Sequence, residues 1–397
     1  MNRSRLPRTV WILGFVSLLM DLSSEIYHAL LPVFLTVTLG LPVAAMGAID
    51  GIAEATASFA KLVSGRLSDR GRRRKPWIVA GYGLAALSKP LFPLAAGAWP
   101  ILAARFADRI GKGIRGSPRD AMIADETPPA IRGRAYGLRQ SLDTVGAALA
   151  PIVAIGLMVL LAENIRLVFW IAVIPAVLSM LLAWAALREP GKRSASSKGA
   201  PLFRGFGEVN APTRGLIAVG FLFTLARFSE GFLILKGLEA GLSATLAPLT
   251  LVLFNLGYLL IAYPAGALSD RSGPRAILAG GMAMLVAGNL ILAADPSMAG
   301  LVAGVILWGA HMGLTQGIFA RMIADRAPEQ VRATSFGAFH FLTGIATLLA
   351  SAGAGLLWDS FGSATTFYAG AVIAATSMAA LALIGGDNPN QNRPARA

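Results

Sequence analysis

Runs of about twenty apolar residues recur along this chain of 397 residues, and they restrict its fold more than any other feature. A helix needs about twenty consecutive apolar residues to cross the roughly 30 Å hydrocarbon core of a bilayer. Twelve segments meet this requirement: 10–38, 44–64, 76–96, 99–123, 137–161, 166–187, 214–236, 245–265, 275–294, 298–321, 334–356 and 363–384. Only 14% of the residues are charged, against about 25% in soluble domains. We therefore predict an all-α integral membrane protein with twelve transmembrane helices.

Lysine and arginine gather in alternate connections between these segments, for example in 66–75, 132–134 and 188–204. Cytoplasmic loops of membrane proteins are enriched in these residues. We therefore predict a multi-pass protein of the bacterial inner (cytoplasmic) membrane with both termini cytoplasmic. The net charge of +14 then reflects topology, so we expect the lipid bilayer as a partner and no nucleic acid. The chain has no cysteine, which excludes disulfides and thiolate-ligated metals.

Short motifs repeat at an offset of about 200 residues: GRLSDR at 65–70 returns as GALSDR at 266–271, and MIAD at 122–125 returns at 322–325. The repeat predicts two pseudo-symmetric halves of six helices each. Such parallel repeats place a binding site between the halves near the middle of the bilayer. The predicted parts are an N-terminal half (1–190), a cytoplasmic linker (191–213), a C-terminal half (214–385) and a polar cytoplasmic tail (386–397).

The repeated loop resembles that of the major facilitator superfamily. GALSDRSGPR at 266–275 matches the family pattern G-x-L-x-D-R-x-G-x-R, and GRLSDRGRRRK at 65–75 is similar, with its second glycine one position early. GAALAP at 146–151 resembles the antiporter motif of the fifth span, and Arg105 resembles the arginine of the fourth span. The resemblance implies a monomeric carrier that works by alternating access. It also implies that the loop residues latch the cytoplasmic side; these gating residues are Gly65, Asp69, Arg70, Gly266, Asp270, Arg271 and Gly273.

A second, weaker resemblance is to the heavy-metal (nickel) resistance and efflux permease branch of the superfamily. It rests on MDLSSEIY at 20–27, DRIGKGIR at 108–115 and PRDA at 118–121. This resemblance implies export of a divalent metal.

Charged residues within the predicted spans are candidates for proton coupling. Asp21, Glu25 and His28 are spaced i, i+4 and i+7, so they share one face of a helix. A charge at bilayer depth costs about 2.5–3.5 kcal/mol or more and normally faces a partner or a water-filled cavity. A carboxyl group can lose its charge by taking up a proton, which arginine cannot do. We therefore predict proton coupling at Glu25 and Asp21, and at Glu230, since Ser229-Glu230 repeats Ser24-Glu25. In the competing interpretation, Glu25 is a structural partner of Arg105 or Arg109.

Polar residues of the other predicted spans are candidates for substrate binding. Arg105, Asp108, Arg109 and Lys112 share one face of the fourth segment. By resemblance, the first, second, fourth and fifth spans and their repeats in the second half line the family's cavity. The predicted substrate-binding residues are Arg105, Arg109, Glu54, Asp143, Arg227, Asn255, Tyr258, His311, Gln316 and His340. The three scattered histidines form no recognisable metal motif, so we assign no metal site.

These features together predict a proton-coupled secondary active transporter, an efflux antiporter of a small molecule or ion. The chain has no Walker-type phosphate loop and no evident nucleophile, so we expect neither a cofactor nor an enzyme. Two alternatives stay open. A divalent metal (nickel, cobalt or iron) exporter would use Asp21, Glu25, Glu54 and His28, whereas a proton-coupled uptake permease for an organic anion would use Arg105, Arg109 and Arg227.

Overall fold

The computed structural model describes residues 6–70, 73–128, 131–189, 209–327 and 332–384. Within these ranges, it leaves out the side chains of 62, 65–66, 69–70, 133, 262–263, 265–272, 316–317, 320, 324 and 332–334. In the described ranges, every regular element is a helix. This confirms the predicted all-α class.

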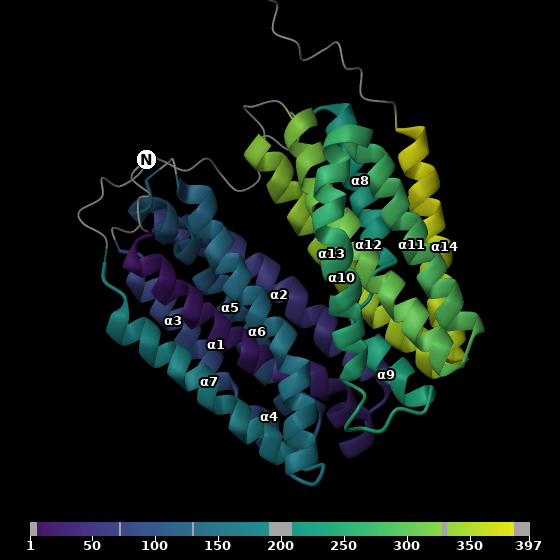
Figure 1. Ribbon diagram of the computed structural model, residues 1–397, viewed down its shortest axis with the longest axis horizontal. Coiled ribbons are helices and arrows are strands. Elements are labelled where there is room, and N and C mark those ends of the chain that lie inside the picture. Colours follow the sequence, from purple (N-terminus) through teal and green to yellow (C-terminus); the bar gives the residue numbers. More distant parts are fainter. Residues whose placement is uncertain (1–5, 71–72, 129–130, 190–208, 328–331, 385–397) are drawn as a thin grey trace, which may run out of the picture.

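The helices fall into two groups that lie side by side (Figure 1). The first group comprises α1 (Arg8–Val33) with its π-helical extension η1 (Phe34–Thr38), α2 (Val43–Arg70), α3 (Lys75–Ser88), α4 (Leu91–Leu94), α5 (Ala98–Glu126), α6 (Arg132–Leu160) and α7 (Ile165–Ala186). The second group comprises α8 (Ala211–Leu225), α9 (Gly231–Glu239), α10 (Leu249–Ser272), α11 (Pro274–Ala294), α12 (Met298–Arg326), α13 (Arg332–Phe361) and α14 (Ser363–Leu383).

Seven stretches in the described ranges are long and apolar enough to cross a membrane: Arg8–Thr38, Arg134–Leu160, Ile165–Ala186, Pro274–Ala294, Met298–Thr315, Ser335–Phe361 and Ser363–Leu383. Large apolar side chains also lie exposed on the outer surface, among them Trp99, Leu160 and Leu383. An exposed apolar surface of this kind needs lipid or protein to cover it. The chain is a multi-pass integral membrane protein.

Two of the predicted segments are interrupted. The segment expected at 76–96 is divided into α3 and α4 at Lys89 and Pro90, and proline removes a helical hydrogen-bond donor. The segment expected at 214–236 is divided into α8 and α9 by residues 226–230. Interrupted membrane helices turn backbone and polar side chains toward a cavity. The second interruption contains two of the predicted site residues, Arg227 and Glu230.

The two groups meet at one end of the molecule, named here the Asp359 end. There the carboxylate of Asp359 on α13 accepts hydrogen bonds from the backbone N–H groups of Val43 (3.0 Å) and Ala44 (2.7 Å) at the start of α2. A side chain at Gly47 would overlap the carbonyl oxygen of Ser351, so glycine is what lets α2 and α13 cross so closely. Toward the opposite end, where α1 begins at Arg8, the two groups diverge (Figure 1). This opposite end is named the Arg8 end.

Glycine also shapes one turn at the Arg8 end. Gly273, a predicted gating residue, joins α10 to α11 with a φ of 79°. Only glycine adopts this conformation at little cost, which gives a physical reason for glycine at that position of the repeated loop.

Candidate functional site

A cavity of about 580 Å³ lies between the two helix groups. One wall is formed by α1, α2, α5 and α6, and the other by α8, α10, α12, α13 and the 226–230 interruption. We refer to these as the first wall and the second wall. Because each helix group supplies one wall, any movement of one group relative to the other changes the shape of the cavity.

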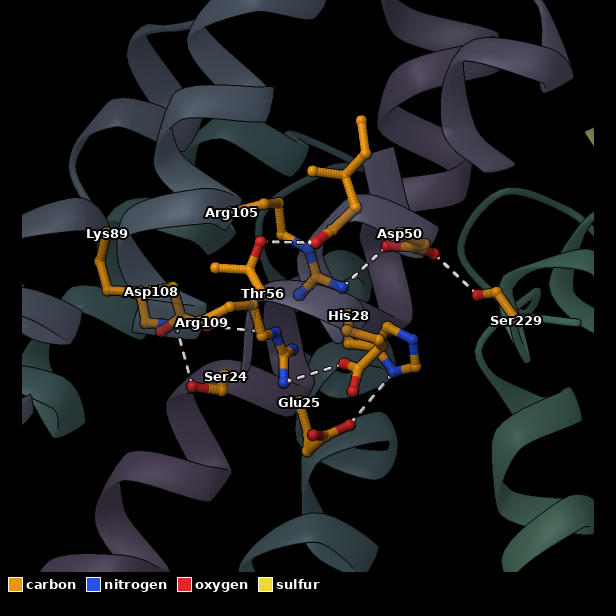
Figure 2. A network of polar contacts seen from close by, with 12 residues as sticks. Ser24, Glu25, His28, Asp50, Thr56, Lys89, Arg105, Asp108, Arg109 and Ser229 are labelled. Carbon is orange, nitrogen blue, oxygen red and sulfur yellow. Dashed lines mark hydrogen bonds and ion pairs between the residues drawn. The ribbon is translucent and has the colours of Figure 1, made fainter. Parts of the chain in front are cut away.

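The first wall is rich in charges, and most of them are paired (Figure 2). Arg105 Nη2 on α5 lies 2.8 Å from Asp50 Oδ1 on α2, and both side chains are almost fully buried. One turn further along both helices, Arg109 Nη1 lies 3.2 Å from Glu54 Oε1. The paired charges explain how this wall tolerates arginine at membrane depth, since each arginine there has a carboxylate partner.

Asp50 also links the first wall to the second. The hydroxyl of Ser229 donates to Asp50 Oδ2 at 2.7 Å (Figure 2), and the backbone N–H of Ser229 donates to Ser351 Oγ at 3.1 Å. Ser229 belongs to the interruption between α8 and α9, which brings its hydroxyl across to α2. The contact therefore joins the two walls of the cavity.

Glu25 forms a separate pair with His28 on the same face of α1. His28 Nδ1 lies 3.2 Å from Glu25 Oε2, and the two side chains are 15% and 27% exposed. Both residues line the cavity. Of the two interpretations considered for Glu25, pairing with Arg105 or Arg109 is not what the described side chains show, since those arginines bind Asp50 and Glu54.

The second wall has a different character, because Phe and Trp rings line it, whereas the lining residues of the first wall include neither. Phe228, Phe254 and Trp308 form one contact group, with ring centroids 5.8 Å apart for Phe228–Trp308 and 6.2 Å for Phe254–Trp308. Phe319 and Phe339 stack at 5.8 Å. The polar residues among these rings include Thr224, Arg227, Asn255 and His340.

Comparison with known proteins identifies the family. The chain matches the Major Facilitator Superfamily over residues 13–237 and 216–397, which together span nearly its whole length. The chain belongs to the major facilitator superfamily. An MFS-type transporter of Methanocaldococcus jannaschii is 29% identical over 382 residues, covering 95% of this chain and 94% of the relative. The family assignment confirms the resemblance seen in the repeated loop.

Two further comparisons are informative. The multidrug resistance protein MdtH of Photorhabdus laumondii is 26% identical over 199 residues, which is 50% of this chain and 48% of that protein. The solved structure of a bacterial homologue of the human lysosomal transporter Spinster, in an inward-facing and occupied conformation, superposes with a TM-score of 0.78. The two chains are 17% identical, and the superposition covers 96% of this chain and 97% of the homologue, so the likeness supports the fold. Membership of the major facilitator superfamily makes the protein a membrane transporter of small solutes, and not an enzyme.

In this major facilitator protein, the predicted site residues occupy several kinds of position. The cavity is lined by Glu25, Glu54, Arg105, Arg109, Arg227, Glu230, Asn255 and His340. His311 is fully buried, with its ring 4.9 Å from that of Trp308 and 6.2 Å from that of Phe223. Tyr258 lies half-buried on α10. The side chains of Gln316, Gly65, Asp69, Arg70, Gly266, Asp270 and Arg271 lie outside the described part of the structure.

Asp21 and Asp143 lie nearer the Arg8 end of the transporter, in a second polar cluster. Asp21 on α1 interacts with Asp143 on α6, and Asp143 Oδ2 lies 3.4 Å from Arg139 Nη1. Arg119 joins the cluster, with Nη1 3.9 Å from Asp143 Oδ1 and 2.8 Å from Ser17 Oγ. The structure therefore separates Asp21 and Asp143 from the cavity-lining pairs.

Sequence reasoning missed one buried charge of this transporter. Lys89, at the break between α3 and α4, donates from Nζ to Asp108 Oδ1 and to Ser24 Oγ, each at 2.9 Å. Its ammonium group lies 5.0 Å from the centre of the Tyr27 ring. Asp108 is also 3.7 Å from Arg109 Nε (Figure 2), so this cluster supports the first wall from behind. The sequence did carry a signal for this buried charge, since Lys89 lies within a predicted apolar span.

Metal ligation has no obvious location in the described part of this transporter. No group of three or more His, Asp and Glu side chains among the described residues is arranged to hold a metal ion. The chemistry available in the cavity is instead that of ion pairs, one Glu–His pair and an aromatic surface.

Proposed function

We propose that the protein is a proton-coupled secondary transporter of the bacterial inner membrane that exports a small solute by antiport. The observation that carries this proposal is the Glu25–His28 pair on the wall of a cavity shared by both helix groups. A carboxyl group in a partly dehydrated cavity can take up and release a proton as its surroundings change. Glu25 differs from Asp50 and Glu54 in its partner, since the imidazole of His28 can itself take up and release a proton, whereas the arginines that pair with Asp50 and Glu54 cannot.

The proposed topology has twelve membrane spans in two halves of six. In this topology, α3 with α4 forms one interrupted span, and α8 with α9 forms another. The helices α2, α5 and α10 also span the membrane, although α2 and α5 carry charged residues and some side chains of α2 and α10 are not described. Basic residues of the connections between helices that end at the Arg8 end favour a cytoplasmic location for that end and for both termini. We propose a monomer in this arrangement.

The structure then corresponds to an inward-facing state. Contacts at the Asp359 end join the two groups, and the groups diverge toward the Arg8 end (Figure 1). In the opposite state, the Asp359 and Ser229 contacts would break. The repeated loops with Asp69, Arg70, Asp270 and Arg271 would then latch the cytoplasmic side, as anions at helix starts and arginine–carboxylate pairs can do.

Export is favoured by the likeness of GAALAP at 146–151 to an antiporter motif and by the partial match to a multidrug resistance protein. Two alternatives compete with it. A divalent metal exporter is supported by the resemblance of the first and fourth segments to metal-resistance permeases, and an uptake permease for an organic anion is supported by Arg227 on the cavity wall.

Proton flux in proteoliposomes tests the proposal. The purified protein is reconstituted around a trapped pH indicator and challenged with nickel, cobalt and ferrous ions, organic cations and organic anions. We expect one class to trigger proton movement. In Glu25→Gln, proton movement and accumulation driven by a pH gradient should be lost, while exchange of labelled solute across the membrane continues, because glutamine resembles the protonated acid.

Glu126→Gln is the matched control, since Glu126 lies in the last turn of α5 away from the cavity lining. Proton movement that persists undiminished in Glu25→Gln would show that Glu25 is not the coupling residue. Solute movement without any proton movement in the unaltered protein would overturn proton coupling itself.

A further inference from the structure

The arginines that line the cavity differ in what already binds them. Arg105 and Arg109 each have a carboxylate oxygen within 3.2 Å. Arg227 has no ion-pair partner within 4.0 Å among the described residues: its Nη2 contacts the sulfur of Met312, its guanidinium lies 5.8 Å from the centre of the Phe223 ring, and its Nε is buried without a hydrogen-bond partner. An arginine in this state has unused donors for a planar anion.

Aromatic side chains share the second wall with Arg227. Phe228 follows it directly in the chain and packs against Trp308 on α12, which in turn packs against Phe254 on α10. Together with Phe319 and Phe339, these rings form an apolar surface on the same wall as Arg227, a cation without an ion-pair partner among the described residues. A small inorganic anion would leave this apolar surface without a partner, whereas an aromatic or aliphatic body would cover it.

The carboxylates of the cavity favour an anion over a cation as the solute. Asp50 and Glu54 are already paired with arginines, and Glu25 is paired with His28. Glu230 has no ion-pair partner within 4.0 Å among the described residues and interacts with Arg227 only at longer range. An organic cation would have to displace a cation already held by the protein at three of these four carboxylates, whereas an anion can use Arg227 directly.

We infer that the second wall is a binding site for amphipathic organic anions, in which Arg227 binds the carboxylate or a similar planar anionic group and the aromatic rings contact the apolar body. Asn255 and Thr224 on the same wall can donate further hydrogen bonds to the solute. This inference rests on the proposed transport function and names the substrate class for it.

Equilibrium binding of three matched fluorescent probes tests the inference without any ion gradient. Dansylglycine is an anion, dansylglycinamide is its neutral analogue and dansylcadaverine is a cation, and all three share one aromatic body. Each is titrated against the full chain in lipid nanodiscs, with the signal from empty nanodiscs subtracted. We expect dansylglycine to bind at least tenfold more tightly than the amide, because an arginine–carboxylate bond is charge-assisted, and the cation to bind most weakly.

Substitutions then locate the anionic group. Arg227→Gln should weaken dansylglycine binding about tenfold or more and leave binding of the neutral amide within threefold. Arg227→Lys keeps the charge but loses the planar pair of donors. Its affinity for dansylglycine should therefore lie between those of the unaltered protein and of Arg227→Gln. Phe254→Ala should weaken both probes alike. Arg214→Gln, an exposed arginine in the first turn of α8, is the matched control and should change nothing.

Each outcome either supports or overturns the inferred anion site. Equal binding of anion and amide to the unaltered protein, or the same loss of both probes in Arg227→Gln, would overturn the inference. Proton flux triggered by a metal or an organic cation, with no binding of dansylglycine, would overturn the inference and leave proton coupling standing. Tight, Arg227-dependent binding of dansylglycine without coupled proton flux would support the inference and overturn the proposed coupling.

Discussion

The two walls of the cavity use charge in different ways. On the first wall, arginine side chains are matched by carboxylates from a neighbouring helix, and Lys89 with Asp108 repeats the arrangement one layer behind. On the second wall, one arginine lies among aromatic rings with no carboxylate within ion-pair distance among the described residues. Paired charges at membrane depth stabilise the fold, whereas an unpaired one is available to a solute.

The sequence repeat makes the contrast sharper at one pair of equivalent positions. Ser24 and Ser229 occupy corresponding places in the two halves of the sequence. Ser24 Oγ accepts a hydrogen bond from Lys89 within the first group, whereas the hydroxyl of Ser229 donates to Asp50 of the other group. One repeated position therefore stabilises a single wall in one half and joins the two walls in the other.

The largest expected effect is on stability, from the loss of a buried pair on the first wall. Arg105→Met would leave Asp50 buried with only the Ser229 hydroxyl as a hydrogen-bond donor among its described contacts. Removing one partner of a buried ion pair typically costs about 3–5 kcal/mol. We expect a large fall in the thermal unfolding temperature, measured by tryptophan fluorescence in detergent.

The double variant Arg105→Met with Asp50→Leu is the control for this prediction. Replacing both partners removes the uncompensated charge, so most of the lost stability should return. A double variant as unstable as Arg105→Met alone would mean that packing around Arg105, rather than the ion pair, supports the first wall.

The apolar runs and the repeat were enough to predict a helical membrane protein and its family, because hydrophobic length and loop motifs are local properties of the chain. Pairing within the site could not be predicted in the same way. Glu25 was the partner considered for Arg105 or Arg109, but these arginines pair with Asp50 and Glu54, and the choice depends on how α1, α2 and α5 pack. Lys89 was missed for the same reason, since its partner Asp108 lies on another helix.

Helical periodicity also left open which residues of a cavity-lining helix reach the cavity. His311 was predicted as a substrate-binding residue because it lies on a span whose equivalents line the family's cavity. The rings of Trp308 and Phe223 lie against it, and the side chain is fully buried. Spacing along one helix does not reveal what a neighbouring helix covers.

An intermediate effect is expected where the two groups meet. Asp359→Ala removes the acceptor of the Val43 and Ala44 N–H groups at the start of α2. Loss of such a helix cap costs about 0.5–2 kcal/mol. Under the proposed alternating access, this should raise the share of molecules opened at the Asp359 end severalfold. Because the chain has no cysteine, spin labels can be placed directly at Val37→Cys and Phe361→Cys, both exposed.

The distance between the two labels reports the opening, and a second population at longer distance should grow in Asp359→Ala. Asp295→Ala is the matched control, because Asp295 accepts the N–H of Ser297 within the second group and has no hydrogen bond to the first group among the described residues. An unchanged distance distribution in Asp359→Ala would show that the helix crossing at Gly47, and not the carboxylate, keeps this end closed.

The smallest expected effect comes from the same arginine-to-methionine change on the second wall. Arg227→Met removes a guanidinium whose described contacts are the sulfur of Met312 and the ring of Phe223, so no carboxylate loses an ion-pair partner. We expect the free energy of unfolding to change by no more than about 1 kcal/mol, within the range of changes that leave no buried charge unpaired. The melting temperature is measured in parallel with that of Arg105→Met. A fall in melting temperature as large as that of Arg105→Met would mean that Arg227 stabilises the fold as Arg105 does. Arg227 would then not be available to bind a solute.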